Sequence, residues 1–219
     1  MSLAQELTEL IAELTLHTPP EPVAMMRRLI VDLEAAGVGK DALKAGDALP
    51  DATLTNAVGQ PVNIAALLKN GPMIINFYRG GWCPLCNLEL RSYQKILYEI
   101  QSLGGQLIAV SPQKPDDSLS TAEKNELEFP VLTDAGNGFA KALGISFELP
   151  AEVINFHTQV GDDMPERNPG AGWTLPIPAV YVVDRDGTIL LAHVDSNFSE
   201  RLEPRLALEA LKSAKPVVS

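Results

Sequence analysis

Cysteine is scarce in this chain, which has two such residues among 219. They stand at positions 83 and 86, so a bond between them would close a very short loop and add little stability. A structural disulfide framework is therefore excluded, and a chemical role for the pair is favoured. Histidine is also rare, with three residues, none at metal-ligand spacing. We therefore predict no metal site and no bound cofactor.

Basic residues are fewer than acidic ones, at 17 against 28, which leaves a formal net charge of −11. A charge of this sign repels phosphate backbones and anionic lipid surfaces, so we expect neither nucleic acid nor membrane as a partner. The longest apolar run, Ala179 to Val183, is far shorter than the ~20 residues that cross a bilayer. The first residues lack a basic segment followed by an apolar one, so we expect no secretory signal and a cytoplasmic location.

The first 45 residues differ in pattern from the rest. Apolar residues recur at three- and four-residue steps from Leu3 to Leu14, which predicts a helix with Ser2 as its N-cap. Prolines then interrupt, and a second helix is predicted from Val23 to Ala36, with Gly37 after it. Residues 1–45 are therefore predicted to be a helical extension. It either packs on the main domain or serves as a face for partner docking or for a homodimer.

Strands and helices alternate in the second predicted domain, residues 46–219. Met73–Tyr78 is typical of a buried central strand, and a long helix is predicted from Pro84 to Leu103. Ala179–Val183 and Thr188–Val194 flank a turn and predict a β-hairpin. Shorter elements are predicted at 51–55, 60–63, 106–111 and 129–133 (strands) and at 63–69, 118–127, 139–143, 151–160 and from 204 (helices). This order indicates an α/β fold with a central mixed sheet flanked by helices.

The segment with the most chemistry reads Phe-Tyr-Arg-Gly-Gly-Trp-Cys-Pro-Leu-Cys over residues 77–86. Two cysteines three residues apart on a first helical turn can close a local disulfide. The N–H groups and dipole of that turn lower the pKa of a thiol. Pro84 suits the first helical position. Arg79 adds positive charge to the thiols or is a solvated loop charge, and Trp82 shields the thiol or simply packs.

Inert buried thiols and a zinc site are the structural alternatives for this segment. Neither requires this spacing before a helix, and zinc lacks further ligands. Arg201 and Arg205 are interpreted as surface charges, and Glu89, one turn after Cys86, as either a helix-surface charge or a proton shuttle.

Separated segments carry a further pattern: Ala45–Asp51, Phe77–Cys86, Leu88–Leu90, Ala109–Pro112, Phe129–Asp134 and Pro178–Gly187. Through them the chain, from about Leu43 to Leu211, resembles the peroxiredoxin-like branch of the AhpC/TSA group in the thioredoxin-fold superfamily. The resemblance implies a thioredoxin-like fold. It also implies reduction of hydroperoxides through a cysteine sulfenic acid and then a disulfide, which thioredoxin or a similar dithiol donor reduces.

This sequence departs from the peroxiredoxin pattern at its active positions. Aligned without gaps, the family's reactive cysteine falls on Cys86, its threonine on Cys83, its proline on Arg79 and its arginine near Pro178. Thioredoxins instead place the reactive cysteine first and a cis-proline before a late strand, which Cys83 and Pro178 match. We therefore predict a Cys83–Cys86 redox disulfide. Exposure at the helix start favours Cys83 as the first nucleophile, and the ungapped alignment favours Cys86.

The functional prediction is a thioredoxin-dependent, peroxiredoxin-like peroxidase. Cys83 and Cys86 are its catalytic residues, and Arg79, Trp82, Pro84 and Pro178 are its supporting residues. Two alternatives stay open. One is a thioredoxin-like protein disulfide oxidoreductase, and the other is a redox-sensing module whose N-terminal helices hold a partner.

Overall fold

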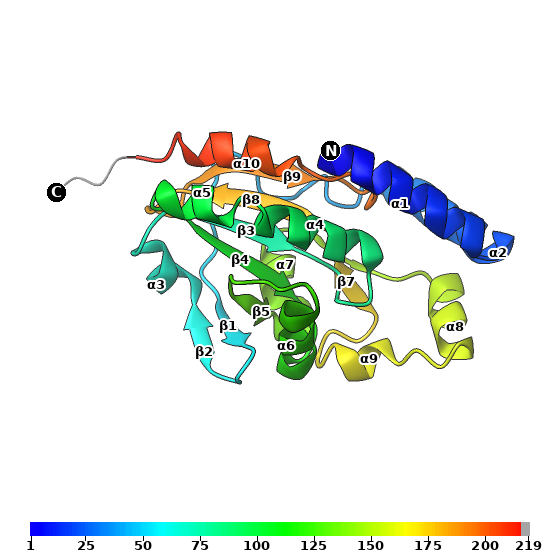
Figure 1. Ribbon diagram of the computed structural model, residues 1–219. Coiled ribbons are helices and arrows are strands. Elements are labelled where there is room, and N and C mark those ends of the chain that lie inside the picture. The colour runs from blue at the N-terminus through cyan, green and yellow to red at the C-terminus, as the bar shows by residue number, and fades with distance from the viewer. Residues whose placement is uncertain (216–219) are drawn as a thin grey trace.

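A seven-stranded mixed sheet with the strand order β2-β1-β5-β4-β3-β8-β9 forms the centre of the computed structural model, which describes residues 1–215 (Figure 1). The strands are β1 (Thr53–Asn56), β2 (Pro61–Asn63), β3 (Met73–Phe77), β4 (Gln106–Ser111), β5 (Val131–Thr133), β8 (Ala179–Val183) and β9 (Ile189–Val194). Strand β3 is parallel to β4 and antiparallel to β8. The predicted α/β class with a central mixed sheet is confirmed. Residues 216–219, where the second predicted domain ends, lie outside the described residues.

Strand β3 is buried at all of its positions. Its apolar side chains point to both faces of the sheet. Met73, Ile75 and Phe77 belong to one hydrophobic core, whereas Ile74 and Tyr78 belong to the other. This alternation is the period-two geometry of a strand with helices on both sides. Beyond Phe77 the chain enters the loop that leads to the two cysteines, so the site is attached to a fully buried strand inside the sheet.

Helices cover both faces of the sheet. They are α1 (Leu3–His17), α2 (Pro20–Ala35), α3 (Ile64–Leu68), α4 (Pro84–Gln94), α5 (Leu97–Ser102), α6 (Pro115–Lys124), α7 (Gly138–Ala142), α8 (Ala151–Gln159), α9 (Met164–Arg167) and α10 (Pro204–Leu211). Helices α1, α4, α5 and α10 share one core, whereas α2, α3, α7 and α8 share the other. No helix among residues 1–215 is long and apolar enough to cross a membrane.

The N-terminal helices pack on the main domain. Leu3 and Leu7 of α1 lie in the core beside α4, whereas Met25 and Leu29 of α2 lie in the core on the opposite face. The two helices therefore reach across one end of the sheet. This is the packing alternative of the sequence analysis, and a homodimer stays a prediction.

The start of α1 is fixed by hydrogen bonds. Ser2 forms the predicted N-cap and completes a capping box with Gln5. The Glu203 carboxylate accepts from the backbone nitrogens of Leu3 at 3.1 Å and Ala4 at 2.9 Å. A carboxylate at a helix N-terminus is favoured by the helix dipole, so the loop before α10 holds α1 in place.

Several element boundaries differ from the predictions. Helix α2 begins at Pro20, three residues early, because prolines are tolerated in a first turn. The long helix predicted over 84–103 is two helices, α4 and α5, separated at Lys95 and Ile96. The helix predicted at 118–127 is α6, which begins at Pro115 for the same reason as α2. A small second sheet of β6 (Ser146–Glu148) and β7 (Thr174–Pro176) was not predicted.

Candidate active site

Cys83 and Cys86 stand at the first turn of α4. Cys83 is the N-cap, and its Sγ accepts a hydrogen bond from the backbone nitrogen of Cys86 at 3.3 Å. Pro84 occupies the first turn, as predicted, and is exposed. A sulfur in the N-cap position meets the free N–H groups and the positive end of the helix dipole, which both favour a thiolate.

Glycine is required in the loop before Cys83. Gly80 has a φ of 155°, and a Cβ at that position would collide with the side chains of Gln113 and Trp82. The Gly81 nitrogen donates to Gln113 Oε1, and the Gly81 carbonyl accepts from Asn87 Nδ2 at 2.8 Å. These bonds hold the loop against α4 and fix the position of the Cys83 sulfur.

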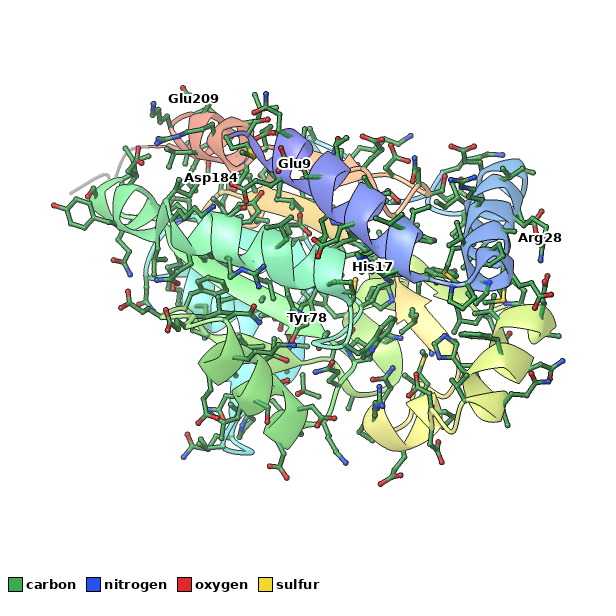
Figure 2. The ribbon with its side chains drawn as sticks, turned by 45° about the vertical axis from the view of Figure 1, so that its right-hand side comes forward. Glu9, His17, Arg28, Tyr78, Asp184 and Glu209 are labelled. Carbon is green, nitrogen blue, oxygen red and sulfur yellow. The ribbon has the colours of Figure 1, made fainter. Side chains whose placement is uncertain are left out.

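The two thiols do not face solvent. Both are free cysteines, and each is 0% exposed. The expectation that the start of the helix presents them to solvent is therefore wrong. Both sulfurs belong to a core that also contains Leu3 and Leu7 of α1, and α1 runs alongside α4 (Figure 2). The predicted disulfide stays a prediction.

Arg79 lies directly beside the first thiol. Its Nη2 donates to Cys83 Sγ at 3.3 Å, and the residue is only 8% exposed. The guanidinium lies 4.2 Å from the ring centroid of Phe198 and 5.3 Å from that of Trp82. Stacking between aromatic rings fixes the fork of donors in place. This geometry agrees with the prediction that Arg79 supplies positive charge to the thiol. It disagrees with the alternative of a solvated loop charge.

Arg201 and Glu89 belong to the site, whereas the sequence analysis assigned Arg201 to the surface and left Glu89 between a surface charge and a proton shuttle. The Arg201 Nε and Glu89 Oε2 atoms lie 2.8 Å apart, and each side chain is 1% exposed. Arg201 also extends Nη2 to within 3.8 Å of Cys86 Sγ. Glu89 had a signal in the sequence, since it follows Cys86 by one helical turn. Arg201 is 115 residues away along the chain and had none.

The charges around the pair separate the two thiols in acidity. Burial raises the pKa of Cys83, but a hydrogen bond with Cys86 and the positive charges of Arg79 and Arg201 outweigh it and hold that pKa well below its usual range. Burial and the neighbouring Cys83 sulfur raise the pKa of Cys86 well above its usual range. Burial also raises the pKa of Glu89 to about 7 against the opposing effect of Arg201. The arrangement therefore pairs a Cys83 thiolate with a protonated Cys86.

The remaining predicted residues lie around this centre. Trp82 is half-buried at the rim and contacts Arg79, and its predicted shielding of the thiol stays a prediction. Pro178 is buried just before Ala179, which pairs with Phe77 in the sheet. The cis-proline expected at Pro178 is wrong, because all peptide bonds of residues 1–215 are trans. The trans bond keeps the chain extended from β7 into β8, with the Ile177 nitrogen bonded to the Ile145 carbonyl at 2.7 Å.

The described part of the chain holds no cluster of three or more histidine, cysteine, aspartate or glutamate side chains that could bind a metal ion. The chemistry this site can perform is thiol chemistry. A stabilised thiolate attacks an electrophilic oxygen or sulfur, and a protonated thiol one helical turn away is placed to close a disulfide.

Comparison with known proteins agrees with this geometry. The model of the AhpC/TSA family matches residues 45–192. The chain is 23% identical over 170 residues to a chloroplastic peroxiredoxin Q of Sedum lineare, covering 78% of each protein. It is 28% identical over 119 residues to a thiol-disulfide oxidoreductase ResA of Halalkalibacterium halodurans, covering 53% of this chain and 66% of that protein. A crystal structure of peroxidoxin BcpB from Mycobacterium tuberculosis matches with a TM-score of 0.63 at 20% identity, covering 80% of this chain and 99% of that one. The predicted thioredoxin-like fold is confirmed.

Proposed function

The chain belongs to the AhpC/TSA family, and from that membership we propose that it is a thiol-dependent peroxidase that reduces hydroperoxides. The electrons come from thioredoxin or a similar dithiol donor. Relatives and solved structures named peroxiredoxin and peroxidoxin support this reaction. We propose that Cys83 and Cys86 carry it as a redox disulfide.

The environment of the Cys83 sulfur carries the proposal. That sulfur caps α4, accepts from Arg79 Nη2 at 3.3 Å and has a pKa held well below its usual range. A thiolate, and not a thiol, is the nucleophile toward a peroxide. This environment supports Cys83 as the first nucleophile, one of the two orders that the sequence left open.

The reaction proceeds in three steps, and atoms and electrons balance in each. The Cys83 thiolate attacks the outer oxygen of ROOH, the O–O bond breaks, and RO⁻ takes a proton and leaves as ROH. The resulting sulfenic acid is then attacked by the Cys86 sulfur, which forms the Cys83–Cys86 bond and releases water. A dithiol finally exchanges with the disulfide and leaves as a disulfide itself, which returns both cysteines to thiols.

Arginine charge replaces the usual activating residues of the family in this scheme. The family's proline, threonine and arginine positions correspond to Arg79, Cys83 and the region of Pro178 in this sequence. Arg79 supplies one positive charge at the Cys83 sulfur, and Arg201 supplies another near Cys86. Both charges stabilise the thiolate, and Arg79 is also placed to stabilise the negative charge that develops on the leaving oxygen.

The burial of both sulfurs adds a requirement to this function. A reductant must approach one sulfur along the axis of the S–S bond, and neither sulfur has an exposed path in the reduced structure. The side chains that bury the pair must therefore move when the protein meets its dithiol donor.

A coupled assay tests the proposal. Hydroperoxide consumption is followed as NADPH oxidation in the presence of thioredoxin and its reductase, for the wild type, Cys83→Ser and Cys86→Ser. We expect turnover by the wild type and none by Cys83→Ser. Cys86→Ser should react once and hold a sulfenic acid on Cys83, detected by mass spectrometry after dimedone labelling. A dimedone adduct on Cys86 in Cys83→Ser, with none on Cys83 in the reverse variant, contradicts the assigned order.

A disulfide oxidoreductase is the second candidate function. It is favoured by the Cys-Pro-Leu-Cys spacing with the more acidic thiol first, and by the similarity to a thiol-disulfide oxidoreductase. Reduction of insulin disulfides by the wild type, without hydroperoxide turnover in the coupled assay, would select this function over the peroxidase.

A further inference from the structure

Helices α8 and α9 lie on the long connection between β6 and β7, residues 149–173. The Leu149 nitrogen donates to the Trp173 carbonyl at 3.0 Å, which closes this connection at its base. Val153 of α8 and Met164 of α9 are 3% and 0% exposed and pack in one of the two cores. The connection is therefore anchored at its base and along its length, so a side chain that it carries has a defined position.

His157 of α8 is the residue through which this connection meets the cysteine loop. Its ring centroid lies 6.3 Å from that of Trp82, and the two planes stand at 71°, an edge-to-face arrangement. The rings of Phe156 and Trp173 lie 5.8 Å and 6.3 Å from the same imidazole. The His157 side chain is 14% exposed, because three aromatic rings enclose it.

Asp162 fixes the orientation of the imidazole. Its Oδ2 lies 2.8 Å from His157 Nδ1, and its Oδ1 lies 2.9 Å from Arg167 Nη2. A hydrogen bond at one ring nitrogen determines how a histidine ring is turned. The side of the imidazole that meets Trp82 is therefore set by the bond to Asp162.

The Trp82 ring also contacts the group that acts on the thiol. The Arg79 guanidinium lies 5.3 Å from its centroid and donates to Cys83 Sγ at 3.3 Å. A Cβ on Gly80 would lie 2.4 Å from the indole nitrogen, so the indole lies directly against the backbone before the cysteine. Contacts therefore continue from His157 through Trp82 and Arg79 to the sulfur.

We propose that His157 is a positioning residue, which holds Trp82 against Arg79 and thereby keeps the guanidinium at the Cys83 sulfur. The inference rests on the proposed thiol chemistry of Cys83 and deepens it by adding a residue from a distant helix. An arginine side chain has several rotatable bonds, and it aims one N–H at a sulfur steadily only where its neighbours restrict it. Trp82 is such a neighbour, and it can restrict Arg79 only while its own ring is held.

Two substitutions of His157 test this role. His157→Asn removes the ring, whereas His157→Phe keeps a planar ring in the aromatic cluster. The readout is the pH midpoint of Cys83 alkylation by iodoacetamide, located by mass spectrometry, because the rate itself also depends on access to the sulfur. We expect the midpoint to rise by about 0.5–1 pH unit in His157→Asn, which is about 3- to 10-fold less thiolate below the midpoint. It should stay at the wild-type value in His157→Phe and in the control His17→Asn, which changes an exposed histidine of α1.

The Arg79→Met background separates positioning from a direct charge effect. A histidine that acts through Arg79 has no further effect once the guanidinium is gone, so adding His157→Asn should leave the midpoint of Arg79→Met unchanged. A direct charge effect of His157 on the sulfur would persist in that background and would also raise the midpoint in His157→Phe. Either of these results would overturn the proposal.

Urea unfolding of the same variants identifies a role in packing alone. A His157→Asn variant that is less stable but keeps the wild-type midpoint would show that the ring only fills space, and the proposal would be wrong. None of these measurements uses a peroxide. A raised midpoint without any hydroperoxide turnover by the wild type would therefore support the positioning role and refute the peroxidase. Turnover by the wild type with an unchanged midpoint in His157→Asn would do the reverse.

Discussion

Arg79 places a positive charge and a hydrogen-bond donor directly at the Cys83 sulfur. Burial alone raises the pKa of that thiol, so without the neighbouring positive charge and hydrogen bonds the thiol would keep its proton at neutral pH. We expect Arg79→Met to raise the pKa of Cys83 and to slow its alkylation by iodoacetamide at pH 7. Each pKa unit above the pH lowers the thiolate fraction about 10-fold. Arg79→Lys keeps the charge but loses the stacking on Phe198. Its Cys83 pKa and alkylation rate should therefore lie between those of the wild type and Arg79→Met.

The measurement is the alkylation rate as a function of pH, from which the pKa is read directly. Because the wild-type pKa is low, its rate should be nearly constant around pH 7 and decrease only on the acidic side. A pH profile of Arg79→Met that superimposes on that of the wild type would show that Arg201 and the helix N-terminus hold the thiolate without Arg79.

Local spacing predicted the centre of the site, and only the folded chain supplied the rest. Cys83 and Cys86 stood out because their spacing before a helix has few structural uses. Arg79 was close enough in sequence to be considered. Arg201 reaches Cys86 from a loop 115 residues further on, and a lone arginine outside any helix or strand carries no local pattern. The burial of the thiols was also hidden, because it depends on how segments far apart in the sequence pack together.

Helix α1 packs against α4, the helix whose first turn carries both cysteines. Leu7 is 4% exposed and lies in the core that contains both cysteines. We expect Leu7→Ala to lower the free energy of unfolding by about 2–5 kcal/mol, the range for a buried leucine. We also expect faster alkylation of Cys83, because a loosened α1 opens more often. Urea unfolding measures the first effect, and iodoacetamide kinetics at pH 8 measure the second.

Leu16→Ala is the control for this prediction, since Leu16 lies on the same helix with 80% of its side chain exposed. It should leave the free energy of unfolding and the alkylation rate at their wild-type values. A Leu7→Ala variant that is destabilised but alkylated no faster would show that another element limits access to Cys83.

Boundaries of elements were predicted less well than the elements themselves. Periodicity located α1, α2 and β3, since each has a long and regular apolar pattern. The early starts of α2 and α6 came from prolines, which end helices in their interior but are favoured in a first turn. Strands β6 and β7 are three residues each and pair with one another across a long separation, so no local alternation marks them.

The whole chain places its helical extension across one end of the sheet, which the sequence pattern could not indicate. An amphipathic helix shows that one face is buried and does not show against what. In the structure α1 joins the core beside α4 and α2 joins the opposite core. The α/β class, by contrast, followed from the alternation of strands and helices, because that order allows few packings.

The buried carboxyl of Glu89 should make the stability of the whole protein depend on pH. Burial raises its pKa from 4.5 to about 7. Between these values the folded state holds a proton that the unfolded state has lost. The contribution of Glu89 to stability is therefore greatest below pH 4.5 and is lost as the pH rises toward 7, by up to about 3 kcal/mol. We expect Glu89→Gln, which carries no titrating proton, to reduce the difference in unfolding free energy between pH 5 and pH 8.

Glu99→Gln, at an exposed ion pair with Arg205, should leave that difference unchanged. Urea unfolding of the three proteins at both pH values measures it. An equal pH dependence in the wild type and Glu89→Gln would mean that Arg201 keeps Glu89 ionised in the folded state throughout this range.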